Sequence, residues 1–184
     1  MKIRRVVTGH DGSGKAVFVS DGEVEPTTVQ LMPGAEFHKL WGSDKTPSFP
    51  DDGARPAEAT YFPPIGGFRF GMFTLPPNTR GAGPPAIADN ASAARELEEK
   101  LPGMASYMEP DAPGMHTTDT VDFEVVLDGE VWLELDNGKE AHLRAGDTVV
   151  QNGTRHAWHN RGTKPVRIAV FIAGARHAKF PERR

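Results

Sequence analysis

The sequence predicts an all-β protein built from antiparallel strands, arranged as a sandwich or a barrel. The main observation lies in the C-terminal part of the chain, where short β-like segments are separated by tight turns such as Asp128-Gly129 and Asp136-Asn137-Gly138. Several short strands at regular spacing are typical of these two architectures. The second observation is the length of 184 residues, which supports one domain with a sizeable core and would crowd two.

The strands of this part are expected between turn residues of the Gly, Asn and Asp type. Their expected bounds are 122–127, 130–135, 140–144, 148–151, 156–160 and 166–173. Segment 68–75 lies between a Gly-Gly and a Pro-Pro pair and is a further strand candidate. One short helix is expected over 92–101, because Glu96 and Lys100 are spaced to pair and Pro102 ends the helical pattern.

The N-terminal part adds an extension to this core. Residues 3–8 and 16–20 are expected to form a hairpin, whereas segment 30–64 is interrupted by prolines and is expected to be an irregular surface segment. A loop rich in Gly and Pro is expected over 78–89. The expected division is an N-terminal extension packed on a barrel (1–65), the barrel itself (66–175) and a polar C-terminal tail (176–184).

Composition excludes several classes of function. The formal net charge is −4, whereas nucleic-acid and membrane-surface binders carry a basic excess, so neither kind of partner is expected. The chain has no cysteine, so any metal must be held by His, Asp or Glu. The N-terminus lacks the apolar core of a signal peptide, and no apolar run reaches the ~18 residues of a membrane span. A cytoplasmic location is therefore expected.

A glycine-rich segment near the N-terminus has most of a phosphate-binding P-loop. Residues 9–16 contain two glycines and a lysine at the P-loop spacing, but Ala16 stands where the motif needs Ser or Thr to hold Mg²⁺. The residues that follow are strand-like, whereas a P-loop opens a helix. A hairpin turn explains these glycines, and no organic cofactor is expected.

Histidine and carboxylate side chains gather in the C-terminal part. Alternate residues of a strand point to the same face, so Asp122 and Glu124 are expected inside and Phe123 outside. His116 has the parity of Asp122, and His156 lies on a later strand. Two histidines and one carboxylate form the set that suits non-haem Fe(II) and related ions when the three side chains converge.

These residues resemble the two sequence motifs of the cupin superfamily. The first motif is matched by Gly114, His116, Asp122 and Gly129, with Thr118 where the family has its second histidine and Asp122 where it has glutamate. The second is matched by Gly146, Gly153, His156 and Asn160, with Gln151 in place of proline and one residue fewer after Gly146. The motifs cover about a third of the chain.

The resemblance implies an antiparallel jelly-roll β-barrel that holds a small organic molecule near a metal. The implied ligands are His116, Asp122 and His156, for a divalent ion such as Fe, Mn, Ni or Zn. Residues expected to contact the bound molecule are Thr118, Trp132 and Trp158. His159 is a reserve candidate if its strand carries a bulge. The resemblance also suggests that the N-terminal extension adds strands or crosses to a second subunit, so a homodimer is expected.

Glu124 leaves three interpretations open, because a buried carboxylate is rarely tolerated without a partner. It could be an additional metal ligand, or a catalytic acid or base with a raised pKa. The structural alternative is an ion pair with Arg155 or Arg167.

The function expected from this site is that of a metal-dependent enzyme of dioxygenase, isomerase, decarboxylase or lyase type. The fold does not choose among these reactions. The alternative is a metal-free barrel that binds or senses a small molecule without catalysis, and a purely structural role is a third, weaker interpretation.

Overall fold

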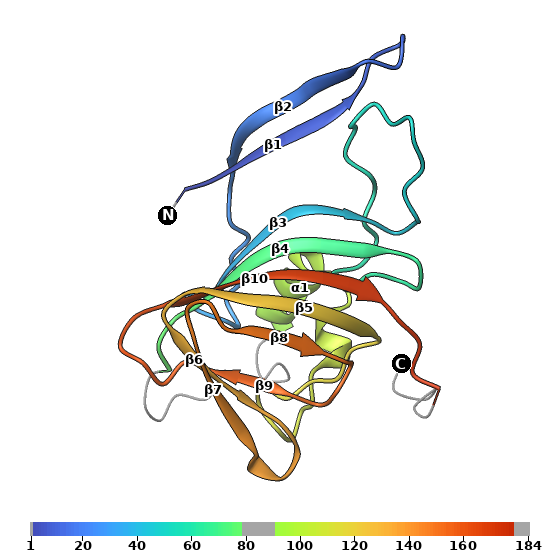
Figure 1. Ribbon diagram of the computed structural model, residues 1–184. Coiled ribbons are helices and arrows are strands. Elements are labelled where there is room, and N and C mark those ends of the chain that lie inside the picture. Colours follow the sequence, from blue (N-terminus) through green and yellow to red (C-terminus); the bar gives the residue numbers. More distant parts are fainter. Residues whose placement is uncertain (1, 79–90, 179–184) are drawn as a thin grey trace.

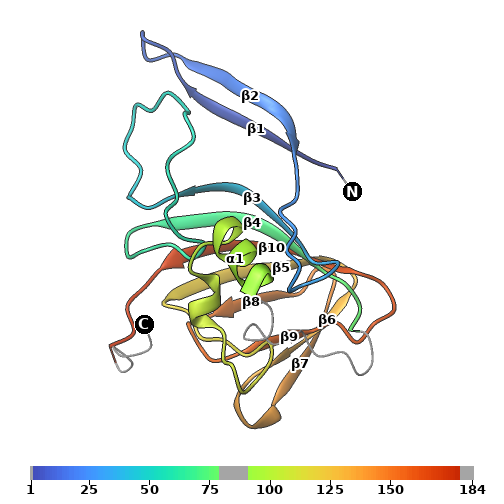
Figure 2. The same ribbon diagram turned by 180° about the vertical axis from the view of Figure 1, so that it is seen from behind.

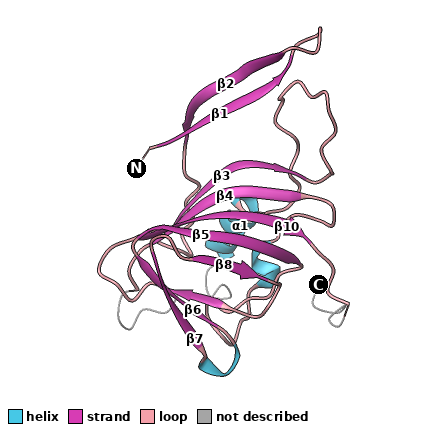
Figure 3. Ribbon diagram, viewed as in Figure 1, coloured by secondary structure: helices cyan, strands magenta, loops and turns pink. Residues whose placement is uncertain are grey.

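The computed structural model describes residues 2–78 and 91–178, and within them most of the regular structure is β-strand (Figures 1 and 3). The strands are β1 (Ile3–His10), β2 (Ala16–Val24), β3 (Glu36–Ser43), β4 (Phe68–Leu75), β5 (Thr120–Asp128), β6 (Glu130–Glu134), β7 (Glu140–Arg144), β8 (Thr148–Gln151), β9 (Ala157–His159) and β10 (Val166–Gly174). The helices are α1 (Ala91–Lys100) and two short 3₁₀ turns, η2 (Met104–Tyr107) and η3 (Asp136–Gly138). None of these described helices has the length and apolar character needed to cross a membrane.

The strands of the described residues form three antiparallel sheets. The largest has the order β3-β4-β10-β5-β8, and a second sheet, β7-β6-β9, lies below it in Figure 1. The third is the hairpin β1-β2, which stands away from the other two (Figure 1). The antiparallel all-β class predicted from the strand and turn pattern is confirmed.

Most element positions expected from the sequence are also confirmed. Strands β4, β7 and β8 have the expected bounds, and α1 begins and ends one residue early. The irregular structure expected over 30–64 is wrong for β3, because the prolines of this segment flank the strand and pairing with β4 completes its hydrogen bonds. Apart from Asn78, the expected loop 78–89 lies outside the described residues, as does 179–184 of the tail.

Two apolar clusters hold the sheets together. The first lies between the five-stranded sheet and α1, which lies in front of the sheet in Figure 2, and it includes Phe37, Leu97 and Val170. The second contains Val126 and Val131, one from each of the two larger sheets, and fills the space between them. The inner face of the five-stranded sheet is therefore apolar at these two places and polar between them.

The glycine-rich turn expected between β1 and β2 is confirmed. The Asp11 carboxylate accepts hydrogen bonds from the backbone N–H of Ser13 (2.8 Å) and of Lys15 (3.0 Å). Strand β2 begins directly afterwards, at Ala16, so the P-loop-like residues form a hairpin turn and no helix follows them.

Gly129, in the turn between β5 and β6, is constrained both by its backbone and by its neighbours. Its φ is 81°, and a Cβ at this position would lie 3.0 Å from the Pro165 carbonyl oxygen. Gly138 also has a positive φ, of 65°, but has nothing within 4 Å of such a Cβ. Alanine at either position adopts a left-handed backbone at a cost of about 1–2 kcal/mol.

We expect Gly129→Ala to lower the free energy of unfolding by at least about 1 kcal/mol more than Gly138→Ala, because only the first also creates a steric overlap. Denaturant unfolding of both variants beside the wild type measures this difference. Equal losses would contradict it.

Candidate functional site

Two carboxylates of β5 lie in the interior, as strand parity predicts. Asp122 and Glu124 are each 5% exposed, whereas Phe123 between them is 48% exposed. Strand β5 is paired on both sides, by β10 and by β8, so its backbone cannot shift to bring these side chains to the surface. The fold therefore places two acidic groups in its interior.

Two histidines that the sequence predicts as metal ligands lie against each other. His116 and His156 form an isolated antiparallel bridge, and their ring centroids are 4.1 Å apart. The Nδ1–H of His116 donates to the Gly114 carbonyl oxygen (3.0 Å), and that of His156 donates to the Thr154 carbonyl oxygen (2.9 Å). Because each Nδ1 carries the proton, each Nε2 presents a lone pair, which is the tautomer a metal ligand needs.

The electrostatics of the site keep both imidazoles neutral. Burial lowers the pKa of His156 to about 3, and the neighbouring His116 contributes to the shift. Burial also lowers the pKa of His116, against the opposing effect of its hydrogen bond to Gly114. Neutral imidazoles at physiological pH bind a cation without first losing a proton.

The carboxylates respond to burial in the opposite direction. Burial raises the pKa of Asp122 to about 6, although a hydrogen bond with Thr120 partly offsets the shift. Burial, together with the charge of Asp122, raises the pKa of Glu124 to about 8. Asp122 Oδ1 and Glu124 Oε2 are both buried without a hydrogen-bond partner. Such orphaned acceptors are costly, so a cation, a proton or a ligand at this place would stabilise the site.

Glu124 does not form the ion pair with Arg155 that was one interpretation of the sequence, and that interpretation is wrong. The Arg155 guanidinium instead binds Glu109 (2.7 Å) and Asp136 (3.1 Å). Arg167 stands across from Thr74 and Asp128, on the face of β10 opposite to the buried Ile168. The interpretations that remain for Glu124 are a metal ligand and a catalytic acid or base.

Thr118, which stands where the family has its second histidine, is fully buried. Thr118 is 1% exposed, and a hydrogen bond of 2.7 Å joins its hydroxyl to that of Thr120. His177 donates from its ring to the Thr118 carbonyl oxygen (2.6 Å). Thr118 therefore supports the interior through Thr120, which in turn bonds Asp122. The sequence did not single out Thr120, although its parity with Asp122 could have done so.

Tyr61 is the other residue that the sequence did not indicate. Burial raises the pKa of its phenol, and the charges of Asp122 and Glu124 raise it further, so the ring lies within reach of both carboxylates. Its backbone N–H donates to the Pro102 carbonyl oxygen (2.8 Å), and its ring packs edge-on against Phe62. A segment that the sequence assigns to the surface thus closes the interior beside the acidic pair.

The two tryptophans expected to contact a ligand are separated by the structure. Trp158 lies edge-on to His156, with ring centroids 6.2 Å apart, and packs against the second apolar cluster. Trp132 lies on the opposite face of the three-stranded sheet, where its ring stacks on His142 at 4.1 Å. Trp158 therefore borders the histidine pair, and Trp132 does not.

The interior donor set fits a divalent metal in its chemistry. Two neutral imidazole nitrogens and one or two carboxylates, with orphaned oxygens among them, are the ligands that such ions take. Within the described residues, however, the group whose ligand atoms all lie within 4.8 Å of one another is Glu134, Glu140 and His159. The interior ligands would have to move closer together to share one ion.

This second group, Glu134, Glu140 and His159, lies on the outer face of the three-stranded sheet. His159 Nε2 is 2.6 Å from the Glu134 carboxylate, and Arg161 pairs with Glu140. The two glutamates stand directly across from each other on β6 and β7. Like charges in such a pair repel. His159 and Arg161 offset this repulsion, and this structural role explains the group without a metal ion.

The chain has clear relatives. Residues 106–172 match the Cupin domain family (Cupin_2). The chain is also 30% identical over 169 residues to the phomopsin biosynthesis cluster protein C′ of Diaporthe leptostromiformis, and the match covers 91% of this chain and 76% of that protein. The chain belongs to the cupin family. The resemblance found in the two sequence motifs is confirmed, and with it the fold class.

Other relatives of this cupin are named as enzymes. The cupin-domain-containing oxidoreductase fogC of Aspergillus ruber is 25% identical over 178 residues, which cover 93% of this chain and 72% of fogC. The cupin-domain-containing oxidoreductase virC of Hypocrea virens is 40% identical over 57 residues, which cover 29% of each chain. This cupin is therefore related to oxidoreductases of fungal biosynthetic clusters.

Proposed function

We propose that this cupin is a metal-dependent oxidoreductase that acts on a small organic molecule in its interior. The observations that carry the proposal are the His116–His156 pair, whose Nε2 atoms present lone pairs, and the two buried carboxyl groups of β5, which have unpartnered oxygens. The names of the relatives support oxidation among the reactions that cupin metal sites perform.

In this proposal His116, His156 and Asp122 hold a divalent ion. A bound divalent ion would supply Lewis-acid or redox chemistry at its open coordination positions. The low pKa of both histidines favours binding near neutral pH, and a pKa of about 6 leaves Asp122 largely ionised at pH 7. Asp122 is thus the more favourable of the two carboxylates as a ligand.

Glu124 and its neighbours provide the remaining functional groups. With a pKa of about 8, Glu124 is largely protonated at pH 7 and can donate a proton from its carboxyl group to a substrate oxygen. The phenol of Tyr61 can donate a hydrogen bond beside it. Trp158 supplies an apolar wall next to His156, which suits an organic substrate.

A metal-free binding protein is the second candidate. Thr118 removes one of the family's ligands, and the interior ligand atoms are not gathered within 4.8 Å. Ionised Asp122 and protonated Glu124 would then bind a polar ligand by hydrogen bonds. This candidate predicts that the purified protein contains no stoichiometric metal.

Metal content of untagged protein, measured by mass spectrometry, separates the candidates. We expect about one divalent ion per chain in the wild type, a loss in His116→Ala and in Asp122→Ala, and no loss in His159→Ala, because His159 lies outside the interior. Traces in every protein would favour the metal-free candidate. A loss confined to His159→Ala would place the ion on the outer group with Glu134 and Glu140.

A further inference from the structure

The C-terminal segment is tied to the chain just before β5. Residues 175–178 follow β10, whose end lies beside the start of β5 in the sheet (Figure 1). The Ala175 backbone N–H donates to the Asp119 carbonyl oxygen (2.8 Å), and the His177 ring donates through Nε2 to the Thr118 carbonyl oxygen (2.6 Å). His177, expected from the sequence to lie in a polar tail, is therefore fixed to the segment that precedes β5.

The His177 ring also lies against the backbone of Gly153, in the segment that precedes β9. A Cβ at Gly153 would overlap Nε2 of His177 and would lie 2.9 Å from the Thr118 carbonyl oxygen. Gly153 is buried, although its neighbours Asn152 and Thr154 are both exposed. The His177 side chain therefore bridges two backbone segments that approach each other closely.

These two segments carry the histidines proposed as metal ligands. His116 lies two residues before Thr118, and His156 lies three residues after Gly153. The backbone N–H of each histidine donates to the carbonyl oxygen of the other, at 2.9 Å in both directions. The separation of the two segments therefore sets the separation of the two imidazole rings.

The backbone ladder between these segments ends at the histidine pair. Hydrogen-bonded pairs alternate with other pairs along an antiparallel ladder, so Thr118 and Thr154 would form the next hydrogen-bonded pair. Within the described residues, however, the bridge of His116 and His156 is isolated. The Thr118 carbonyl oxygen instead accepts from the His177 ring. The Thr154 carbonyl oxygen accepts from Nδ1 of His156 (2.9 Å), which orients that ring.

We propose that His177 is a positioning residue, which ends the ladder at the histidine pair and so keeps the Thr154 carbonyl oxygen as the acceptor for His156. Without the His177 ring, the buried Thr118 carbonyl oxygen would lose its partner or would pair with Thr154, at the expense of the bond that orients His156. His177 acts through the backbone of its neighbours. Its effect on a metal rests on the proposed function, because the orientation of His156 matters there only if His156 binds the ion.

Hydrogen exchange of the metal-free protein, followed by mass spectrometry of its peptides, tests this role without any metal. We expect His177→Ala to speed exchange in residues 113–120 and 152–158 and to leave β4 unchanged. His177→Gln keeps a donor and should restore the protection, whereas His177→Phe fills the space without a donor and should not. His10→Ala is the matched control, because a hydrogen bond of 3.0 Å also joins Nδ1 of His10 to a carbonyl oxygen, that of Asp51, but in the hairpin.

Zinc binding measures the consequence for the metal site. Chelator-treated protein is titrated with Zn²⁺ in a calorimeter, in a His159→Ala background that disables the outer group. We expect His177→Ala to bind zinc about tenfold more weakly, as is typical when support for a metal ligand is lost, and His177→Gln to keep the affinity of the parent protein.

Three results decide between the possibilities. Unchanged exchange in His177→Ala, or exchange that rises equally in all strands, would overturn the proposal. So would an unaltered zinc affinity in that variant. If no protein binds zinc while exchange still rises at the two histidine segments, the proposed function fails and the positioning of the histidines by His177 stands.

Discussion

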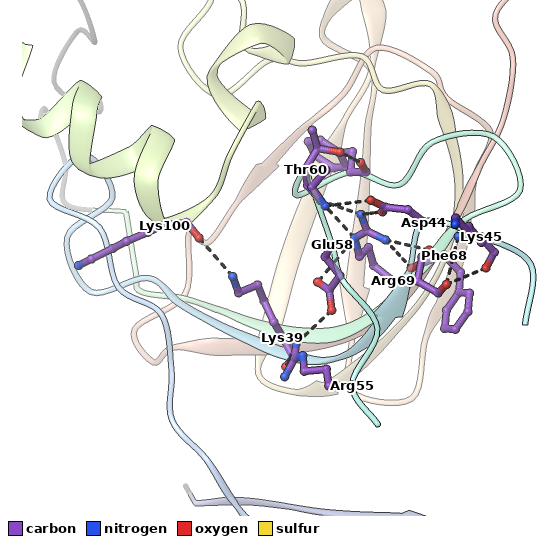
Figure 4. Close-up of polar contacts among 12 residues, drawn as sticks. Lys39, Asp44, Lys45, Arg55, Glu58, Thr60, Phe68, Arg69 and Lys100 are labelled. Atoms are coloured by element: carbon purple, nitrogen blue, oxygen red, sulfur yellow. Dashed lines mark hydrogen bonds and ion pairs between the residues drawn. The ribbon is translucent and has the colours of Figure 1, made fainter. Parts of the chain in front are cut away.

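Replacement of Arg69 by methionine is expected to lower the free energy of unfolding by about 3 to 5 kcal/mol, the cost of removing one partner from a buried ion pair. Arg69 lies on β4 and is 6% exposed as a whole residue, and acceptor atoms surround its guanidinium. It pairs with Asp44 and lies 3.7 Å from the Glu58 carboxylate (Figure 4). Methionine fills similar space and cannot satisfy these groups.

The same guanidinium ties a long segment to the sheet. It donates to the carbonyl oxygens of Ser43 (3.0 Å), Phe68 (2.9 Å) and Thr60 (2.8 Å) (Figure 4). Thr60 directly precedes Tyr61, whose ring lies beside the acidic pair. Loss of Arg69 should therefore loosen the segment that closes the interior, as well as destabilise the fold.

Arg55→Met is the matched control, because Arg55 also pairs with Glu58. Its side chain is 41% exposed, compared with 8% for Arg69, so its ion pair contributes less than about 1 kcal/mol. Denaturant unfolding of both variants at one protein concentration measures the difference. Equal effects would show that the position of Arg69 in the interior does not matter.

The stability of the metal-free protein is expected to fall by about 2 kcal/mol between pH 6.5 and pH 8 because of Glu124. Burial and the charge of Asp122 raise the pKa of Glu124 to about 8, from 4.5 for the free group. The folded state then binds this proton more tightly than the unfolded state. Stability is therefore lost as the pH rises from the free value toward 8.

Other buried groups act mainly at lower pH. Asp122, with a pKa of about 6, adds to the loss only up to pH 6. The lowered pKa values of His156 and His116 have the opposite sign, because the unfolded state binds more protons below their free value of 6.5, and stability rises with pH there. Above pH 6.5 the contribution of Glu124 remains.

Thermal or denaturant unfolding of chelator-treated protein at several pH values measures this slope. We expect Glu124→Gln to flatten it, because glutamine cannot ionise, and Glu99→Gln, an exposed change on α1, to leave it unaltered. A slope that is the same in wild type and in Glu124→Gln would contradict the raised pKa.

The local pattern of the chain predicts much of this fold. Turn residues such as Gly129 and Gly146 need a positive φ and so mark where strands end. The alternation along β5 places Asp122 and Glu124 inside and Phe123 outside, because successive side chains of a strand point to opposite faces. The spacing of His116 and His156 within the two motifs identified the histidines that meet.

The parts that the sequence did not predict depend on contacts between distant segments. Strand β3 forms because β4 completes its hydrogen bonds, although its flanking prolines resemble those of a loop. Tyr61 reaches the acidic pair because Arg69 and Pro102 hold its segment in place. No pattern in the neighbouring residues of the sequence predicts either of these two contacts.

The sequence by itself determined the antiparallel β class, the family and the inward positions of Asp122 and Glu124, because these follow from turns, motif spacing and strand parity. Only the tertiary structure decided that Thr118 forms a hydrogen bond with Thr120, that Arg155 pairs with Glu109 and that Trp132 faces away from the interior. Register between strands and packing between sheets set these features, and both are properties of the whole fold.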